Sequence, residues 1–506
     1  MRLTQRISSS RLLVAGAAIG ILTLGALLRF YRIGRQDLWY DETYSVFLIN
    51  HFDQLRYDYH PPLYYALLQL WSWLVGDGEA QLRALSAVGS LCAVAVTGAL
   101  AGSIGGRSLG LLSAALVACS PVQIWYAQEV RSYAWLTAFI GLVLLSIARR
   151  ADHPNSLCWR AAFIGACLAA IYTSYATVFF LAAIPLLLVA GSYRAQWFQI
   201  LSDLTVVGLG CLPLLSLASS QTWQFAGGFW IPPVDPQRVL QSLQDLMIGY
   251  ETKGTWAVPV LLGVFIVGLA RWWRTNRAAA VLLALGSLGP MIACAVFSRW
   301  HPLYLTRQLL PAALVFWIVI ASVMMWARTR RVSHLSLIAM TILCLATGLR
   351  HQFLDVLPRA KPPFKPVFAF IQERWAPGDT LIHANAVTVF PAFYYGETLE
   401  PYIRLWWSPT EQDQRMIASQ WTPSAHQWAD RRISGMAELG QSAGGRFWVL
   451  YGSEDRAGTL DAHANAVQSW FRKQQDPELA VRVEDIFIER YAALQSANDA
   501  SGETGK

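Results

Sequence analysis

Two adjacent carboxylates, Asp41 and Glu42, stand in the stretch DLWYDETYSV, shortly after an apolar run of membrane-spanning length. A carboxylate that aromatic side chains partly shield from water can act as a general base. A pair of carboxylates also offers oxygen ligands to a divalent cation. A solvated loop with aromatic residues at the membrane interface is the simpler interpretation of the same stretch. We favour a functional pair because other polar groups are predicted on the same side of the membrane.

The first of these groups comprises His60 and a short charged connection with Gln128, Glu129 and Arg131. His60 precedes two prolines, which produce an extended chain and then a helix start, so a purely structural role is one alternative. Glu129 and Arg131 can also simply pair with each other. Charge between two apolar segments is nevertheless costly unless it is used, which indicates a functional role.

The second group surrounds Tyr304, just before an apolar segment that begins at residue 308, and contains Arg299, His301 and Arg307. Arginine at a membrane surface can merely extend its side chain towards water. Short outer loops are usually poor in arginine, however, and a guanidinium suits a lipid phosphate.

Together these residues predict transfer from a lipid-linked phosphate donor. A base would take the proton of an acceptor hydroxyl, and the arginines would stabilise the leaving phosphate. If a divalent metal takes part, Asp41 and Glu129 are its candidate ligands.

The elements that position these residues are predicted to be membrane helices. Of 506 residues, 55% are hydrophobic and only 14% are charged, whereas about a quarter are charged in soluble proteins. The net charge of +8 gathers on no face or tail, so no nucleic-acid partner is predicted. The seven cysteines form no CxxC pair and indicate neither disulfides nor a cysteine metal site. About eleven segments are candidate spans: 12–30, 81–104, 109–126, 131–149, 160–174, 175–191, 199–219, 256–273, 278–298, 308–327 and 333–350.

The apolar segment 62–76 is short for a crossing and is predicted to lie along the outer surface. With this choice the short arginine-rich connections all face the cytoplasm, as the positive-inside rule expects. Segments 31–80, 125–133 and 298–308 then share the outer face, which is where the candidate residues meet.

Three domains follow from the change in composition near residue 350. Residues 1–350 are predicted to form a transmembrane catalytic domain, with 31–80 as its first outer loop and juxtamembrane helices. Residues 351–495 show helix, turn and strand patterns typical of a small α/β domain outside the membrane. Residues 496–506 are predicted to be a disordered tail.

Three motifs in this order, LWYDETYS, HPPLYYALLQLW and SPVQIWYAQEVRSYAWL, resemble the bacterial GT-C glycosyltransferases. This superfamily contains the protein O-mannosyltransferases and the lipid A aminoarabinose transferases. The resemblance covers residues 12–190 well, and LYLTRQLLPA at 303–312 more weakly.

The resemblance implies a polytopic α-helical fold in the bacterial inner membrane, with an active site that faces the periplasm. It implies a hexosyl- or pentosyltransferase with an inverting mechanism, which takes a sugar from a polyprenyl-phosphate-linked donor. It makes Asp41 the general base, with Glu42 beside it and Glu129 as a further catalytic residue. His60, Gln128, Arg131, Tyr304 and Arg307 become substrate ligands. A histidine that many relatives carry near YTSYA (172–176) is missing, which puts any acceptor or metal contact of that turn in doubt.

Several alternatives stay open at this stage. A transporter or flippase for lipid-linked sugars is the main rival, although such proteins usually show repeats and charge near the bilayer midplane. An inactive relative that acts as a scaffold would keep the same fold. The acceptor can be a glycan of the cell envelope, a lipid or a protein, and a divalent metal is an open question.

Overall fold

The computed structural model of the chain describes residues 2–189, 196–222, 231, 233–249, 257–328, 331–356, 361–384, 386–406, 432–433, 445–452, 460 and 462–492. The chain forms two compact units, and each is considered by itself. The first contains Met1–Arg35, His60–Leu217 and Ile231–Arg359. The second contains Gln36–Tyr59, Ala218–Trp230 and Ala360–Lys506. The predicted tail 496–506 lies outside the described residues.

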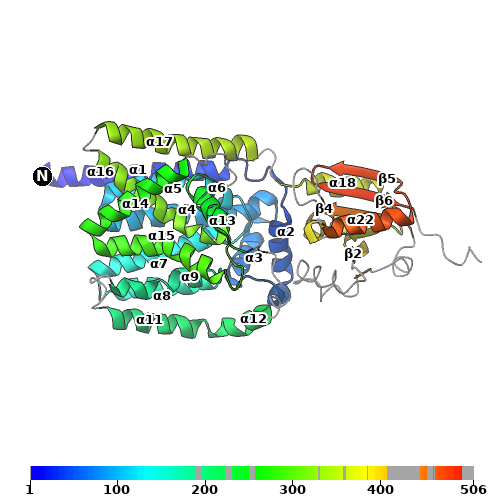
Figure 1. Cartoon of the computed structure of the whole chain (residues 1–506), viewed down its shortest axis with the longest axis horizontal. Coiled ribbons are helices and arrows are strands. Elements are labelled where there is room, and N and C mark those ends of the chain that lie inside the picture. Colours follow the sequence, from blue (N-terminus) through cyan, green and yellow to red (C-terminus); the bar gives the residue numbers. More distant parts are fainter. Residues whose placement is uncertain are drawn as a thin grey trace, which may run out of the picture. The chain divides into compact units, whose positions relative to one another are not determined.

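The first unit is helical, and its long helices run side by side (Figure 1). Its helices are α1 (Arg2–Phe30), α3 (Leu63–Val75), α4 (Glu79–Gly105), α5 (Arg107–Ala118), α6 (Pro121–Ala127), α7 (Tyr133–Asp152), α8 (Leu157–Ile171), α9 (Thr177–Leu181), η2 (Ile184–Val189), α11 (Trp197–Gly210), the start of α12 (Leu212–Thr222), α13 (Pro236–Met247), α14 (Ala257–Thr275), α15 (Arg277–Phe297), η4 (Thr306–Leu309), α16 (Pro311–Ala327), α17 (Arg331–Arg350) and η5 (His351–Val356).

Within the described residues, six helices are long and apolar enough to cross a membrane, or up to eight if each of two bent helix pairs is one span. The bent pairs are α5 with α6 and α11 with α12, with bends of 60° and 56°. The chain is therefore a multi-pass membrane protein. All eleven predicted segments contain helix, but a count of eleven spans is not confirmed, because α8, α9 with η2, and α16 are shorter apolar helices. Helix α3 is also short, with 13 residues.

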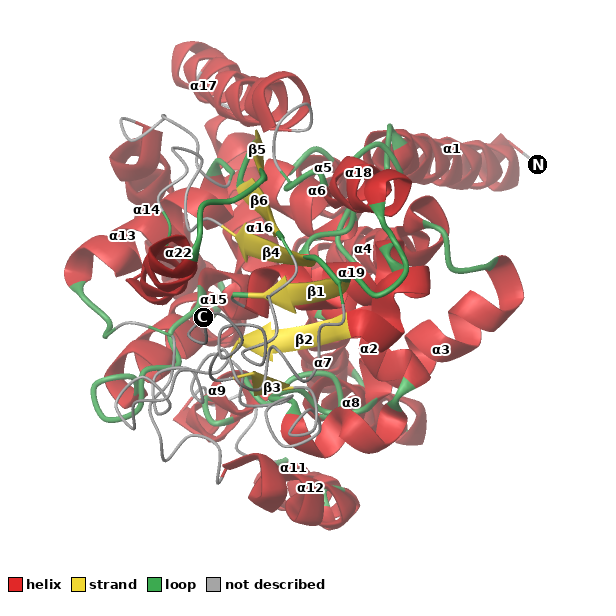
Figure 2. Cartoon of the chain, turned by 90° about the vertical axis from the view of Figure 1, so that its right-hand side faces the viewer, coloured by secondary structure: helices red, strands yellow, loops and turns green. Residues whose placement is uncertain are grey.

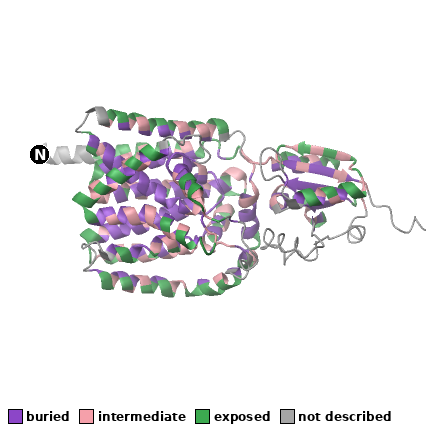
Figure 3. Ribbon diagram, in the orientation of Figure 1, coloured by how far each residue is buried: buried purple, intermediate pink, exposed green. Residues whose placement is uncertain are grey.

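Burial within the first unit increases towards its centre (Figure 3). Every residue from Ala312 to Ala321 of α16 is fully buried, which is typical of a helix that is apolar on all sides and surrounded by others. Only 11% of the apolar window of α1 is buried, so this helix turns most of its surface outward. Helices α4 and α5 approach closely at Gly110, where an added Cβ would lie 2.6 Å from the carbonyl oxygen of Gly98. Small residues allow such contacts between membrane helices.

The second unit contains a six-stranded sheet with the order β3-β2-β1-β4-β6-β5 (Figure 2). Strands β1 to β4 are parallel, β6 is antiparallel to β4, and β5 is antiparallel to β6. Glu484 has a φ of 51° in the tight turn between β5 and β6. The elements of this unit are α2 (Tyr40–Asn50), η1 (Phe52–Tyr57), α18 (Phe364–Arg374), β1 (Thr380–His383), η6 (Ala386–Thr388), α19 (Val389–Tyr395), η7 (Glu397–Tyr402), β2 (Ile403–Trp406), β3 (Arg432–Ile433), β4 (Phe447–Gly452), α22 (Ala462–Gln474), β5 (Leu479–Val483) and β6 (Ile486–Tyr491).

Helices cover both faces of strand β4, all of whose residues are buried. Phe447 and Trp448 are successive residues of the strand, so their side chains point to opposite faces. Phe447 packs against Phe471 of α22 with ring centroids 5.6 Å apart. Trp448 points to the opposite face and contacts Phe370 of α18 edge to face. A strand covered on both sides is expected to be a continuous apolar run, as the sequence FWVLYG is. The helical first unit and the sheet of the second unit together confirm the prediction of a polytopic helical fold with a C-terminal α/β domain.

Candidate functional site

The connection between α6 and α7 places its polar side chains inside the first unit. Gln128, Glu129 and Arg131 are 7%, 5% and 4% exposed. The amide nitrogen of Gln128 donates to the carbonyl oxygens of Arg29 and Tyr31, both at 3.0 Å. These carbonyls lie at the C-terminal end of α1, where helical partners are missing. Gln128 therefore closes the end of α1, and its predicted role as a substrate ligand stays a prediction.

Glu129 accepts a hydrogen bond of 3.0 Å from the indole nitrogen of Trp125. Its backbone carbonyl accepts the N–H of Arg131 at 2.8 Å. These local bonds hold the connection in one conformation while the Glu129 carboxylate stays buried. Its predicted catalytic role remains a prediction.

Two arginines lie against the ring of Tyr133, and His60 contacts one of them. The guanidinium carbon of Arg131 lies 5.8 Å from the ring centroid, and that of Arg307 lies 5.6 Å from it. Arg131 also donates from Nη2 to Nε2 of His60 at 3.2 Å. Because arginine is always a donor, Nε2 of His60 accepts in this contact. The structure thus brings together His60, Arg131 and Arg307, three of the predicted substrate ligands.

This cluster has the properties of an anion site. Two guanidinium groups lie 5.8 and 5.6 Å from the centroid of one aromatic ring, which places two positive charges in one region of the first unit, and a guanidinium suits a phosphate. The Tyr133 hydroxyl is buried and has no hydrogen-bond partner among the described residues. A buried polar group without a partner calls for an explanation, and a bound phosphate oxygen would provide one.

The remaining residues of the predicted Tyr304 group separate. Tyr304 is 1% exposed and belongs to the hydrophobic core. Burial raises the pKa of its hydroxyl to about 12, so the phenol stays protonated at neutral pH. Arg299 and His301 are exposed. Of the donors predicted around Tyr304, only Arg307 is seen at the Tyr133 ring.

Asp41 and Glu42 lie in the second unit, in the first turn of α2. Asp41 is partly exposed, whereas Glu42 is fully buried. Oε2 of Glu42 accepts a hydrogen bond from Lys361 at 2.6 Å and one from the backbone N–H of Trp39 at 3.3 Å. The expectation that Asp41 shares one cavity with Glu129 stays a prediction, because the two residues belong to different units.

The described residues contain no group of three or more histidine, cysteine, aspartate or glutamate side chains that could hold a metal ion. The suggested metal ligands, Asp41 and Glu129, belong to separate units, and their role in metal binding stays a prediction.

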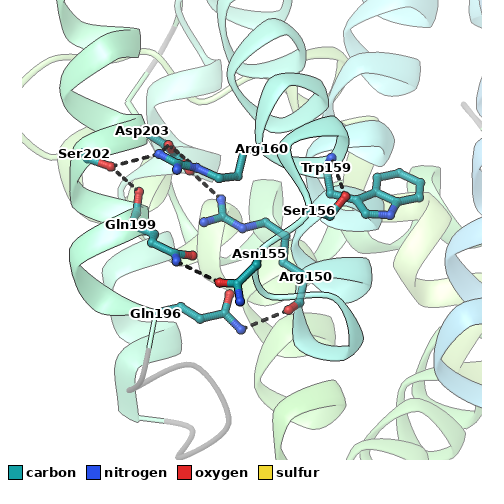
Figure 4. A network of polar contacts seen from close by, with 9 residues as sticks. All are labelled: Arg150, Asn155, Ser156, Trp159, Arg160, Gln196, Gln199, Ser202 and Asp203. Carbon is teal, nitrogen blue, oxygen red and sulfur yellow. Dashed lines mark hydrogen bonds and ion pairs between the residues drawn. The ribbon is translucent and has the colours of Figure 1, made fainter.

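A buried ion-pair network that the sequence does not reveal joins three helices of the first unit (Figure 4). Asp203 of α11 is fully buried and accepts hydrogen bonds from Arg150 of α7 at 2.8 Å and from Arg160 of α8 at 2.6 and 3.1 Å. Arg150 lies 17 residues from Tyr133 along α7, about 26 Å at 1.5 Å per residue. The network therefore stabilises the bundle far from the anion site. A lone aspartate in an apolar helix, as in WFQILSDLTVVGLG, is the signal that could have revealed it.

Comparison of the sequence with known protein families finds one matching family. Residues 59–219 match the model of the dolichyl-phosphate-mannose-protein mannosyltransferase family. The match includes His60 and Arg131 and leaves out Asp41 and Arg307. None of the curated proteins matches the chain.

Three solved structures have similar folds at low sequence identity. ArnT from Cupriavidus metallidurans in the apo state has a TM-score of 0.62 and 13% identity, over 96% of this chain and 98% of that one. Its complex with undecaprenyl phosphate has a TM-score of 0.63 and 14% identity, over 97% and 99%. The oligosaccharyltransferase AglB from Archaeoglobus fulgidus, in complex with an inhibitory peptide and a dolichol-phosphate, has a TM-score of 0.55 and 9% identity, over 87% and 69%. The chain therefore has a fold similar to that of ArnT and of AglB, and its residues 59–219 resemble the dolichyl-phosphate-mannose-protein mannosyltransferase family.

Proposed function

We propose that the chain is a membrane glycosyltransferase that moves a sugar from a polyprenyl-phosphate-linked donor to an acceptor hydroxyl on the periplasmic face of the inner membrane. The observation that carries this proposal is the convergence of Arg131 and Arg307 on the buried ring of Tyr133, with His60 beside Arg131. The comparisons support it from a separate direction, since one similar structure holds undecaprenyl phosphate and another holds a dolichol-phosphate.

In the proposed reaction the acceptor oxygen attacks the anomeric carbon of the sugar. Its proton passes to the carboxylate of Asp41, which acts as general base. The bond between the anomeric carbon and the phosphate oxygen breaks, and the electron pair leaves with polyprenyl phosphate. Arg131 and Arg307 stabilise the charge that develops on this phosphate. A single displacement of this kind inverts the anomeric configuration.

The test is an assay with purified protein and a panel of polyprenyl-phosphate sugars, run with a chelator and with added Mg²⁺ or Mn²⁺. We expect one donor to release polyprenyl phosphate and to form a product whose anomeric centre is inverted, which NMR coupling constants report. The Asp41→Asn variant is the control for background hydrolysis. If no donor is consumed under any metal condition, the transferase proposal fails.

The position of the site on the periplasmic face has its own test. Reporter fusions at residue 58 and at residue 130 should both report the periplasm. Fusions that place these two positions on opposite sides of the membrane would contradict a site shared by Asp41 and Arg131.

A further inference from the structure

The two carboxylates of α2 occupy different environments. Asp41 is partly exposed, while Glu42 is buried and holds the ammonium of Lys361, whose side chain is only 8% exposed. Lys361 precedes two prolines, which restrict the backbone to extended conformations and hold the lysine in place. A buried carboxylate stays charged at low cost only when it is paired and hydrogen-bonded. Glu42, buried and ion-paired, is therefore suited to hold the helix in place, whereas the more exposed Asp41 is suited to react with a substrate.

Aromatic contacts hold the same helix from one side. The ring of Phe390 in α19 lies 5.5 Å from that of Tyr40, 4.7 Å from that of Tyr44 and 5.2 Å from that of Phe47. These positions are four and three residues apart and so share one face of α2. Aromatic pairs contribute stability beyond the area that they bury, so Phe390 fixes the rotation of α2 about its axis.

Backbone contacts hold the chain just before the helix. The N–H of Leu38 donates to the hydroxyl of Tyr395 at 2.7 Å. The N–H of Lys365 donates to the carboxylate of Asp37 at 2.8 Å. Asp41 is thus held on both sides, by contacts at residues 37 and 38 before it and at residue 42 after it.

We propose that residues 361–395 of the second unit position helix α2, with the Lys361–Glu42 ion pair as its anchor, and so hold Asp41 in the place from which it acts. This inference rests on the proposed function of Asp41. It gives the C-terminal domain a role in the reaction, and it makes Glu42 a positioning residue where the sequence predicts a catalytic one. Lys361 is its positioning partner.

The first experiment measures sugar transfer at varied donor concentration. In Lys361→Met, kcat should fall about 10- to 100-fold, because a displacement near 1 Å has an effect of this size. The donor KM should change less than about threefold, since the anion site at Tyr133 is intact. Lys361→Arg keeps the charge and should restore most of kcat. The double variant Glu42→Gln with Lys361→Met should be more active than Lys361→Met alone, because residue 42 then carries no buried charge that has lost its lysine.

Lys473 of α22 provides the matched control. Its side chain is exposed, and α22 is not among the elements proposed to position α2. Lys473→Met should keep kcat within about twofold of wild type. An equal loss in Lys361→Met and Lys473→Met would show that the loss of a positive charge, and not the anchor, lowers the rate.

The second experiment does not depend on activity. Hydrogen–deuterium exchange of the full chain in detergent should show at least about tenfold faster exchange in residues 40–50 for Lys361→Met and Tyr395→Phe. Exchange in α22 should not change. If neither variant alters residues 40–50, or if exchange rises while kcat stays at the wild-type value, the positioning role is wrong. If wild type transfers no sugar from any donor, the proposed function fails, and exchange still decides whether Lys361 anchors α2.

Discussion

Replacement of Asp203 by asparagine tests the buried ion-pair network of the first unit. The carboxylate is fully buried and accepts three hydrogen bonds from two guanidinium groups. Asparagine removes the negative charge and places an N–H₂ donor where a guanidinium donor already lies. The 2% exposed side chain of Arg150 then keeps its charge inside the bundle with no counter-ion. Arg160 is 31% exposed and can turn to solvent, so it contributes less.

The expected magnitude follows from this difference in burial. Loss of one partner from a buried ion pair destabilises a protein by about 3–5 kcal/mol. At roughly 2 °C per kcal/mol for a large protein, the unfolding midpoint should fall by roughly 6–10 °C. Tryptophan fluorescence of the detergent-solubilised protein during heating measures this midpoint.

Two further variants separate charge burial from general damage to α11. Gln199→Ala changes the same helix at an exposed hydrogen bond to Asn155 and should cost less than about 1 kcal/mol. Arg150→Met combined with Asp203→Leu removes both buried charges and should recover most of the loss. A midpoint for Asp203→Asn within 2 °C of wild type, or a double variant less stable than Asp203→Asn, would refute the reasoning.

Three other predictions concern the proposed site and the sheet domain. Asp41→Asn should lower the rate of transfer by about 10²- to 10⁴-fold, the usual contribution of a general base, and the release of polyprenyl phosphate measures it. Arg307→Gln should lower kcat/KM for the donor about 10- to 100-fold, because a hydrogen bond to a charged group contributes about 1.5–3 kcal/mol. Initial rates at varied donor concentration measure kcat/KM, and unchanged kinetics would show that Arg307 does not belong to the site. Burial lowers the pKa of His383 to about 3, so the folded state favours the neutral imidazole. The folding stability that depends on this shift is fully present above about pH 6.5 and is lost as the pH falls towards 3. Between pH 7.5 and 5.0 the sheet domain should therefore lose about 2 kcal/mol more in wild type than in His383→Asn, and equal pH dependence in denaturant titrations of the full chains would contradict this.

The apolar segments could be predicted because each depends only on its own residues. A helix in lipid must satisfy its backbone internally and needs a run of about twenty apolar side chains, which a window of sequence reveals. All eleven predicted segments contain helix for this reason. The sequence does not reveal the sheet order, because strands as short as β2 and β3, with four and two residues, are defined by pairing with distant neighbours. Residues 479–491, within the predicted α/β domain, form the hairpin of β5 and β6, whose pairing depends on local sequence.

The sequence by itself determined the types of group that could carry the chemistry: an acidic pair after the first apolar segment, a histidine before two prolines, and arginines at two later connections. Only the tertiary structure decided which of them meet. Arg131 and Arg307 lie against Tyr133, and His60 contacts Arg131, because separate elements pack together, and no local pattern encodes that packing. Glu42 pairs with Lys361, 319 residues later in the chain. Local sequence sets periodicity and hydropathy, whereas the partner of a buried charge is set by whichever distant side chain packing brings within about 3 Å.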